Sequence, residues 1–265
     1  MHRFFKNYIY IYFTICLIGV AAVWILFGLL FNISVGELAA IIGAIIIALI
    51  MCLLFITKMR KINNIMINDC NIEEYIRISN SILSNQTFKK LRTILKLNLS
   101  VGYLNDGNSE LAKKMLNSID RFSNTRWGAL YRVSYYNSLV AYYFQIKDIG
   151  NVIDSMKELQ IALKNKKLNN AYKNKILCLY RDKESLLNME NNNYDGAEQV
   201  FIAALEREKK MLGKVYAKYT LGIVYLHYNR LEEATEAFEF AAKNGGTSYY
   251  VERAKKNLLK LEKIC

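Results

Sequence analysis

The stretch YTLGIVYLHYNRLEEATEAFEFAAKNGG, residues 219–246, decides the fold class of this chain. In its second half, LEEATEAFEFAAK, one helical face carries Leu231, Ala234, Phe238 and Ala241, and glutamates occupy the other face. This spacing predicts an amphipathic α-helix. The two glycines that follow are typical of a helix end.

The preceding half predicts a second helix that packs against the first. Its segment KVYAKYTLGIVYLHY holds Leu221 and Tyr225 one turn apart, and residues 229–230 form the turn. Two antiparallel helices that cross closely need small side chains at the contact, which Gly222 and Ala234 supply. Tyr225 and Phe238 fill the space above and below, so the stretch predicts a helix–turn–helix hairpin.

The same spacing recurs earlier in the chain. Two segments keep it in both helices: Leu99, Ser100, Tyr103, Ala112, Leu116 and Ile119 in one, and Leu139, Val140, Tyr143, Val152, Met156 and Leu159 in the other. A further segment keeps it only in its second helix, with Ala197, Phe201 and Ala204. There, Glu184 and Asn188 stand where Leu and Tyr are expected, which a slip or inserted residues would explain.

The pattern resembles the tetratricopeptide repeat (TPR), a hairpin of about 34 residues with Trp, Leu-Gly, Tyr, Ala, Phe, Ala and Pro at fixed places. Lys218 and Gly246 replace the Trp and the Pro in the best copy. The resemblance implies an α-solenoid, in which stacked hairpins share one core. We expect repeats at residues 93–126, 133–166, 178–211 and 215–248, connecting helices at 62–92 and a capping helix at 249–265.

The N-terminal part predicts a membrane anchor. Two runs without charge, interrupted only by Glu37, are each long enough to cross about 30 Å of hydrocarbon. We expect an anchor over residues 1–61 with transmembrane helices at about 8–31 and 38–56. A cleaved signal peptide with a site at residues 20–22 is the alternative. The fold class predicted is therefore all-α: a two-helix transmembrane hairpin followed by TPR-like hairpins.

Charge predicts the orientation of the anchor and bears on its partners. Basic residues flank both spans (Arg3 and Lys6 before, Lys58, Arg60 and Lys61 after), which favours a plasma-membrane protein with both termini and the repeats in the cytoplasm. The net charge of +13 suggests weak attraction to anionic lipid or to an acidic partner, and the sequence does not decide between them. We find no nucleic-acid motif and expect no nucleic-acid partner. Small residues on the second span fit packing on the first span, or a homodimer.

The sequence offers no sign of catalysis. Its two histidines are His2 and His227, and the five cysteines have no metal-ligand spacing. No phosphate-binding loop, zinc motif or serine elbow occurs. We therefore expect no enzyme activity, no cofactor and no metal.

The repeat resemblance implies a concave groove lined by the first helices of the hairpins. The groove residues that it implies are Leu97, Val101, Leu104, Asn105, Asn137, Ala141, Phe144, Gln145, Tyr219, Ile223, Leu226 and His227. The lysine and asparagine set that grips C-terminal carboxylates in chaperone-binding members is absent, since Leu97, Asn137 and Tyr219 stand where lysine would be needed.

These features predict a membrane-tethered, non-catalytic scaffold or adaptor that holds a protein or peptide in the groove. Two alternatives remain open. The chain could be a peptide-responsive regulator, or an accessory subunit of a membrane enzyme or transport complex whose essential contacts are made by the spans.

Overall fold

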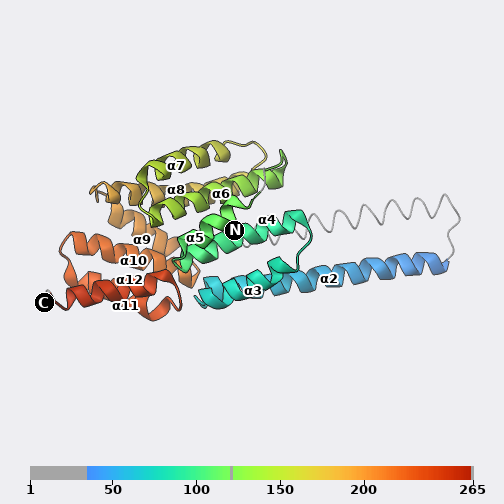
Figure 1. Ribbon diagram of the computed structural model, residues 1–265, viewed down its shortest axis with the longest axis horizontal. Helices are drawn as coiled ribbons and strands as arrows, with labels where there is room; N and C mark the ends of the chain where they lie inside the picture. Colours follow the sequence, from blue (N-terminus) through green and yellow to red (C-terminus); the bar gives the residue numbers. More distant parts are fainter. Residues whose placement is uncertain (1–34, 120–121, 264–265) are drawn as a thin grey trace. The chain divides into compact units, whose positions relative to one another are not determined.

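The computed structural model describes residues 35–119 and 122–263, and all regular structure in them is helical (Figure 1). Eleven helices lie in these residues, without a strand, so the predicted all-α class is confirmed for the part that the structure describes. The chain divides into two compact units, residues 1–62 and 63–265.

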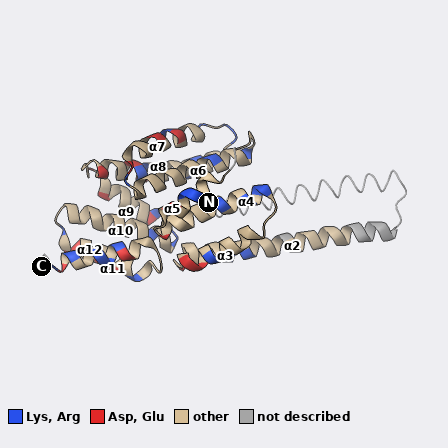
Figure 2. Ribbon diagram, viewed as in Figure 1, with Lys and Arg blue, Asp and Glu red and all other residues tan. Residues whose placement is uncertain are grey.

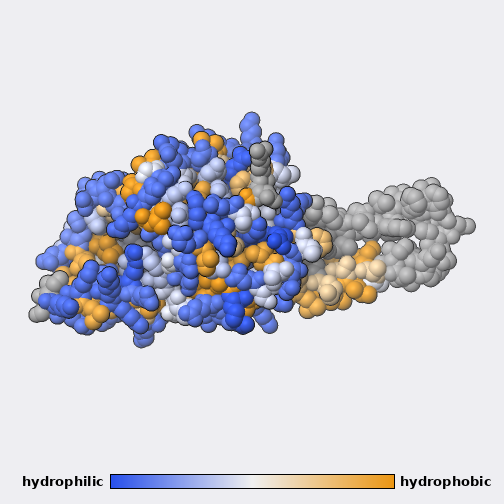
Figure 3. Space-filling view, in the orientation of Figure 1, coloured by the Kyte–Doolittle hydropathy of each residue, from blue (hydrophilic) through white to orange (hydrophobic). Residues whose placement is uncertain are grey.

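The first unit contains most of helix α2, Val35–Ile67. Its segment Ile42–Ile67 is long and apolar enough to cross a membrane, and large side chains such as Ile47, Met51 and Leu54 are exposed on it. Figure 3 shows hydrophobic surface on the described part of this helix. The predicted second span, residues 38–56, lies within α2, which extends beyond it to Ile67. The predicted first span, residues 8–31, lies outside the described residues.

The second unit contains the remaining helices. They are α3 (Ile72–Ser84), α4 (Lys89–Asn105), α5 (Ser109–Asn117), α6 (Arg126–Gln145), α7 (Ile149–Leu163), α8 (Asn170–Glu190), α9 (Ala197–Arg207), α10 (Met211–His227), α11 (Leu231–Asn244) and α12 (Tyr249–Leu261). Each packs against the next in sequence, from α3 to α12. Figure 2 shows lysine and arginine on most of these helices, interspersed with acidic residues.

Four helix pairs share one turn geometry. The turns of α4–α5, α6–α7, α8–α9 and α10–α11 each contain a residue with positive φ: Gly107, Lys147, Asn192 and Asn229, respectively. In each, the next backbone N–H donates to a carbonyl five residues earlier: Asn108 to Tyr103 (2.8 Å), Asp148 to Tyr143 (3.0 Å), Asn193 to Asn188 (2.9 Å) and Arg230 to Tyr225 (2.9 Å). These bonds satisfy carbonyl groups that the end of a helix leaves free.

This geometry explains the irregular third pair, α8–α9, without a slip. The Asn193–Asn188 hydrogen bond corresponds to the Tyr225 bond of α10, so Glu184 and Asn188 occupy the Leu and Tyr positions in register. Ser185 is buried at the position that Gly222 holds in α10. The pair differs in that α8 begins early, at Asn170, and α9 begins only at Ala197, after an irregular segment.

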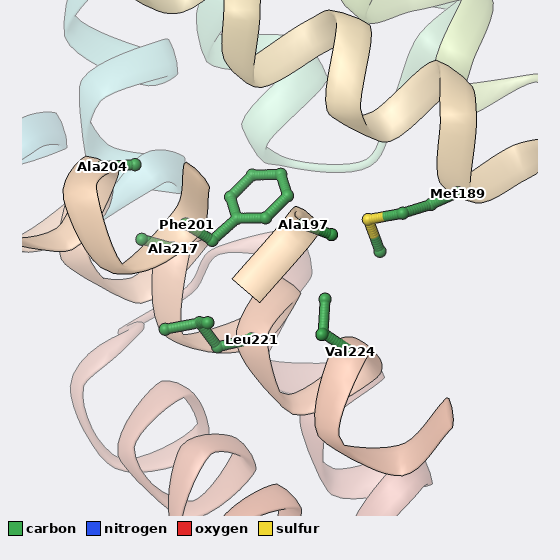
Figure 4. Packing of buried hydrophobic residues seen from close by; sticks show 7 residues of the cluster. All are labelled: Met189, Ala197, Phe201, Ala204, Ala217, Leu221 and Val224. Atoms are coloured by element: carbon green, nitrogen blue, oxygen red, sulfur yellow. The ribbon is translucent and has the colours of Figure 1, made fainter. Parts of the chain in front are cut away.

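Buried apolar residues join neighbouring pairs. One cluster draws Met189 from α8 together with residues of α9 and α10 (Figure 4): Ala197, Phe201, Ala204, Ala217, Leu221 and Val224. Another joins Leu99 and Tyr103 of α4 to Ala112 of α5 and Tyr142 of α6. Because each helix pair exposes an apolar face on both sides, its burial depends on the neighbouring pairs.

Candidate functional site

We group the first helix of each pair with α12 under the name inner layer: α4, α6, α8, α10 and α12. In this layer α4 contacts α6 and α12, and α12 also contacts α10, so helices distant in sequence meet there. The second helices, α5, α7, α9 and α11, contact chiefly their neighbours in sequence. All twelve residues of the predicted groove lie on inner-layer helices.

The four predicted residues of α4 differ in their exposure. Leu97 and Leu104 are buried, and Leu104 belongs to the cluster that joins α4 to α6. Val101 and Asn105 are half-buried, and the Asn105 side-chain amide donates to the Val101 carbonyl of its own helix (2.8 Å). Of these four, only Val101 and Asn105 retain appreciable surface.

Two predicted residues of α6 make polar contacts between helices. The backbone carbonyl of Asn137 accepts a hydrogen bond from Lys183 Nζ of α8 (3.2 Å). Gln145 Nε2 donates to the backbone carbonyl of Leu104 (3.1 Å). Both side chains keep a buried oxygen, Oδ1 of Asn137 and Oε1 of Gln145, without a hydrogen-bond partner among the described residues.

The other two predicted residues of α6 take part in packing. Ala141 packs at the edge of the cluster shared by α4, α5 and α6. Phe144 packs beside Val140, Val152 and Met156, which join α6 to α7. Both are half-buried, and their positions serve contacts within the chain.

The predicted residues of α10 are half-buried or exposed. The Tyr219 ring lies against Phe238 (5.8 Å between centroids), and Ile223 packs at the edge of the cluster that joins α8, α9 and α10. Leu226 is half-buried. His227 is exposed, and its ring stacks on Tyr194 with centroids 3.7 Å apart and planes at 6°.

Two charged residues in the middle of α8 were missed by the sequence prediction. Asp182 is buried, and Arg207 of α9 donates to its Oδ2 at 2.6 Å. Burial raises the pKa of the Asp182 carboxyl, and the Arg207 charge opposes that rise. The neighbouring Lys183 is half-buried, and withdrawal of its ammonium from water lowers the pKa of that group to about 8. The signal in the sequence was a charged pair at positions where the other three copies carry Leu97-Asn98, Asn137-Ser138 and Tyr219-Thr220.

Three tyrosines meet where α10 and α12 pack together, and one of them, Tyr216, lies close enough to Asp182 for the carboxylate charge to act on its phenol. The Tyr250 ring of α12 lies 5.7 Å from the Tyr216 ring and 5.6 Å from the Tyr219 ring, both of α10. Burial raises the pKa of the Tyr216 and Tyr250 phenols, and the Asp182 charge adds to the rise at Tyr216. We group these residues of α6, α8, α10 and α12 under the name inner-layer cluster: Asn137, Asp182, Lys183, Tyr216, Tyr219 and Tyr250.

The chemistry of the inner-layer cluster suits binding. Aromatic rings offer apolar contact area with a polar tip, and an ammonium that is withdrawn from water with one carbonyl partner retains donors for an acceptor. Among the described residues, no three His, Cys, Asp or Glu side chains are grouped as metal ligands would be. Comparisons with known protein families, curated protein sequences and solved structures found no match to this chain.

Proposed function

We propose that this chain is a membrane-tethered interaction module, in which TPR-like hairpins form an α-solenoid that holds a protein or peptide partner without catalysis. The inner-layer cluster carries the proposal. It combines three tyrosine rings with a lysine whose hydrogen-bonding capacity is only partly used. Tyrosine is among the residue types that dominate binding energy at protein interfaces, and an ammonium group with unused donors can bind an acceptor on a partner.

The membrane part of the proposal is supported by α2. A helix of 33 residues with exposed isoleucine, leucine and methionine side chains has an apolar surface that hydrocarbon would cover. Lys58, Arg60 and Lys61 then lie at the cytoplasmic end, just before the second unit in the sequence. In this proposal a second span precedes α2, the repeats are cytoplasmic, and the basic charge adds weak attraction to anionic lipid.

Photo-crosslinking in cells tests the function. The full chain with benzoylphenylalanine in place of Tyr250 should yield a crosslinked protein or peptide. The same replacement at Lys256, an exposed position of the same helix, should not yield it. Lys183→Met should weaken the crosslink at position 250 at least fivefold, whereas Lys175→Met, an exposed lysine of α8, should leave it unchanged.

These substitutions separate binding from folding better than changes in the predicted groove leucines. Leu104 is buried in the contact of α4 with α6, so a charge there would disturb packing in any case. If positions 250 and 256 give the same crosslinks, the inner-layer cluster does not bind the partner. If replacing α2 by an unrelated span abolishes function while the crosslink persists, the spans make the essential contacts, as in an accessory subunit.

A further inference from the structure

The two ends of the second unit are joined to each other. The loop between α11 and α12 lies beside the turn that precedes α3, although the two are 175 residues apart in the chain (Figure 1). The Thr247 backbone N–H donates to the Cys70 carbonyl (3.0 Å), and the Ile72 backbone N–H donates to Thr247 Oγ1 (2.8 Å). The hydroxyl of Thr247 therefore satisfies an N–H group that the first turn of α3 leaves free.

The backbone on both sides is shaped for this contact. Cys70 and Gly246 both have positive φ, 52° and 57°. A Cβ on Gly246 would overlap the Cys70 carbonyl oxygen, so only glycine fits there without a shift. Glycine is also the residue that adopts positive φ without cost. Cys70 is an ordinary L-residue in that region and has no exposed surface.

A second contact joins the same two ends. The Tyr249 ring of α12 lies over Gly107, in the turn between α4 and α5, where an added Cβ would come within 2.7 Å of the ring. Gly107 also has positive φ, 82°. The Gln145 side chain lies close enough to the Tyr249 phenol to lower its pKa, against the larger upward effect of burial. Tyr249 thus ties α12 to α4 and α6.

Through these contacts the last helix of the array packs against an early one, so the array closes on itself. Contacts run from α4 along the chain to α12 and return from α12 to α4. We call the residues that make the closing contacts the seam: Cys70, Ile72, Gly107, Gly246, Thr247 and Tyr249. An array of stacked hairpins needs no such closure for its stability, since each pair is stabilised by its neighbours.

We propose that the seam is a gate: the array closes on itself through Thr247 and Tyr249, and it opens there to admit a partner to the inner-layer cluster. The proposal rests on the proposed function for its partner, and it adds how access is regulated. Hydrogen bonds of Thr247 join the gate directly to the turn that follows α2.

The seam is a suitable place for opening on energetic grounds. The neighbouring pairs are held by shared apolar clusters such as the one around Phe201. At the seam, the contact with α3 includes part-buried hydrogen bonds of the exposed residue Thr247, which lie beside the buried Cys70 and Ile72, and water can replace these bonds. Local opening occurs where exposed hydrogen bonds hold a contact.

Cys70 provides a natural reporter of the gate. Its thiol is fully buried beneath Gly246 and Thr247, and burial raises its pKa to about 11, so alkylation requires opening. Cys178 of α8 is part-exposed and serves as the internal reference. The experiment measures iodoacetamide labelling of both cysteines by peptide mass spectrometry in the folded full chain in detergent.

Thr247→Val removes the hydroxyl acceptor and keeps the shape of the side chain. We expect it to increase the labelling rate of Cys70 about five- to tenfold, because the backbone N–H groups of Ile72 and Glu73 both lose their acceptor, and to leave Cys178 unchanged. Thr235→Val is the matched control, because the Thr235 hydroxyl donates within its own helix, to Leu231 (2.9 Å). Gly107→Ala should act in the same direction as Thr247→Val through Tyr249.

The second readout is the access of a partner to the inner-layer cluster. The crosslink yield at position 250 should rise in Thr247→Val together with Cys70 labelling. The gate is refuted if Cys70 labelling in Thr247→Val equals that of the wild type, or if labelling rises while the crosslink yield does not. If no variant yields a crosslink at position 250, the proposed function fails, whereas the labelling still decides whether the seam opens.

Discussion

The ring of Phe238 on α11 lies directly against Gly222 on α10. A Cβ added to Gly222 would come within 2.6 Å of the ring, which is closer than two carbon atoms can approach. The same relationship recurs earlier, where Tyr75 of α3 lies 2.9 Å from the place that a Cβ on Gly102 of α4 would take. In both cases a helix gives up a side chain so that a neighbouring ring can be fully buried.

Gly222→Ala is therefore expected to destabilise the protein. Alanine favours a helix by about 1 kcal/mol over glycine, but overpacking against Phe238 costs about 1–3 kcal/mol, so the net loss is about 1 kcal/mol. Gly150→Ala on α7 is the control. A Cβ there meets only Asp148 Oδ1 at 3.8 Å, so this change should be neutral or slightly stabilising. Chemical denaturation of both variants measures the difference, and equal effects would show that Phe238 moves aside freely.

Arg207→Met is expected to cost about 2 kcal/mol of unfolding free energy. The change leaves the buried Asp182 carboxylate without its 2.6 Å partner, which is costly in a low-dielectric interior. The magnitude is below that of a fully buried pair because the Arg207 side chain is 40% exposed.

A double-mutant cycle isolates the Asp182–Arg207 pair. Asp182→Asn removes the charge that Arg207 compensates, so Arg207→Met should cost much less when it is combined with Asp182→Asn. Denaturation at neutral pH gives the unfolding free energies of the wild type, the two single variants and the double variant. Additive effects of the two changes would mean that the ion pair itself contributes nothing.

The lowered pKa of Lys183 predicts that the stability of the protein depends on pH. The folded-state pKa is about 8 and the ordinary value 10.5, so below pH 8 the ammonium is charged in both states and its burial cost is fully present. Between pH 8 and 10.5 the folded protein loses this proton first, and stability rises with pH. Lys183→Met should therefore be more stable than the wild type by about 2 kcal/mol at pH 7, with the difference vanishing above about pH 10.5.

The wild type and Lys183→Met contain the same tyrosines. The difference between their unfolding free energies is therefore not affected by tyrosine titration. Lys175→Met, on an exposed part of the same helix, should show no such pH-dependent difference. Denaturation curves at pH 7 and pH 9.5 suffice. A constant gap between Lys183→Met and the wild type at both pH values would contradict a lowered pKa.

Phe88→Asp is expected to stabilise α4 by about 0.5–1 kcal/mol. Phe88 is the N-cap of α4 with extended backbone, makes no side-chain cap and is 74% exposed, whereas an aspartate there accepts from a free backbone N–H. Asn108→Ala is the opposite experiment, because Asn108 Oδ1 accepts from Leu111 N–H (3.1 Å) at the start of α5. It should lose about 1 kcal/mol. Thermal unfolding measures whether Phe88→Asp raises the stability and Asn108→Ala lowers it.

The helices and the turns of the second unit follow from short-range patterns. The apolar spacing around Ala112, Val152 and Ala234 predicts helix pairs because it depends on residues within one or two turns of one another. The third pair is less evident from the sequence, because Glu184 and Asn188 interrupt the apolar pattern although the backbone keeps the register of the other pairs. Only the hydrogen bond from Asn193 to Asn188 reveals that register, and residue types do not encode it in a readable way.

The candidate site was predicted in outline from the first helices of the pairs, but the strongest polar contacts were not. Asp182 and Lys183 look like surface charges in the sequence, because a charged residue on a helix is usually solvated. Their removal from water depends on Arg207 from the next helix and Asn137 from a distant one. Conversely, Leu97 and Leu104 looked like binding residues and are buried within the array.

The sequence by itself determined that residues 35–119 and 122–263 are chiefly helical, where the long apolar helix among them lies and how residues pair within a hairpin, because these depend on spacings of a few residues. The tertiary structure alone decided that Tyr250 lies beside Tyr216, that the Lys183 ammonium meets the Asn137 carbonyl, and that Thr247 closes on the turn at Cys70. These contacts join residues far apart in the chain, and each depends on the summed rotations of the intervening hairpins, which no local pattern specifies.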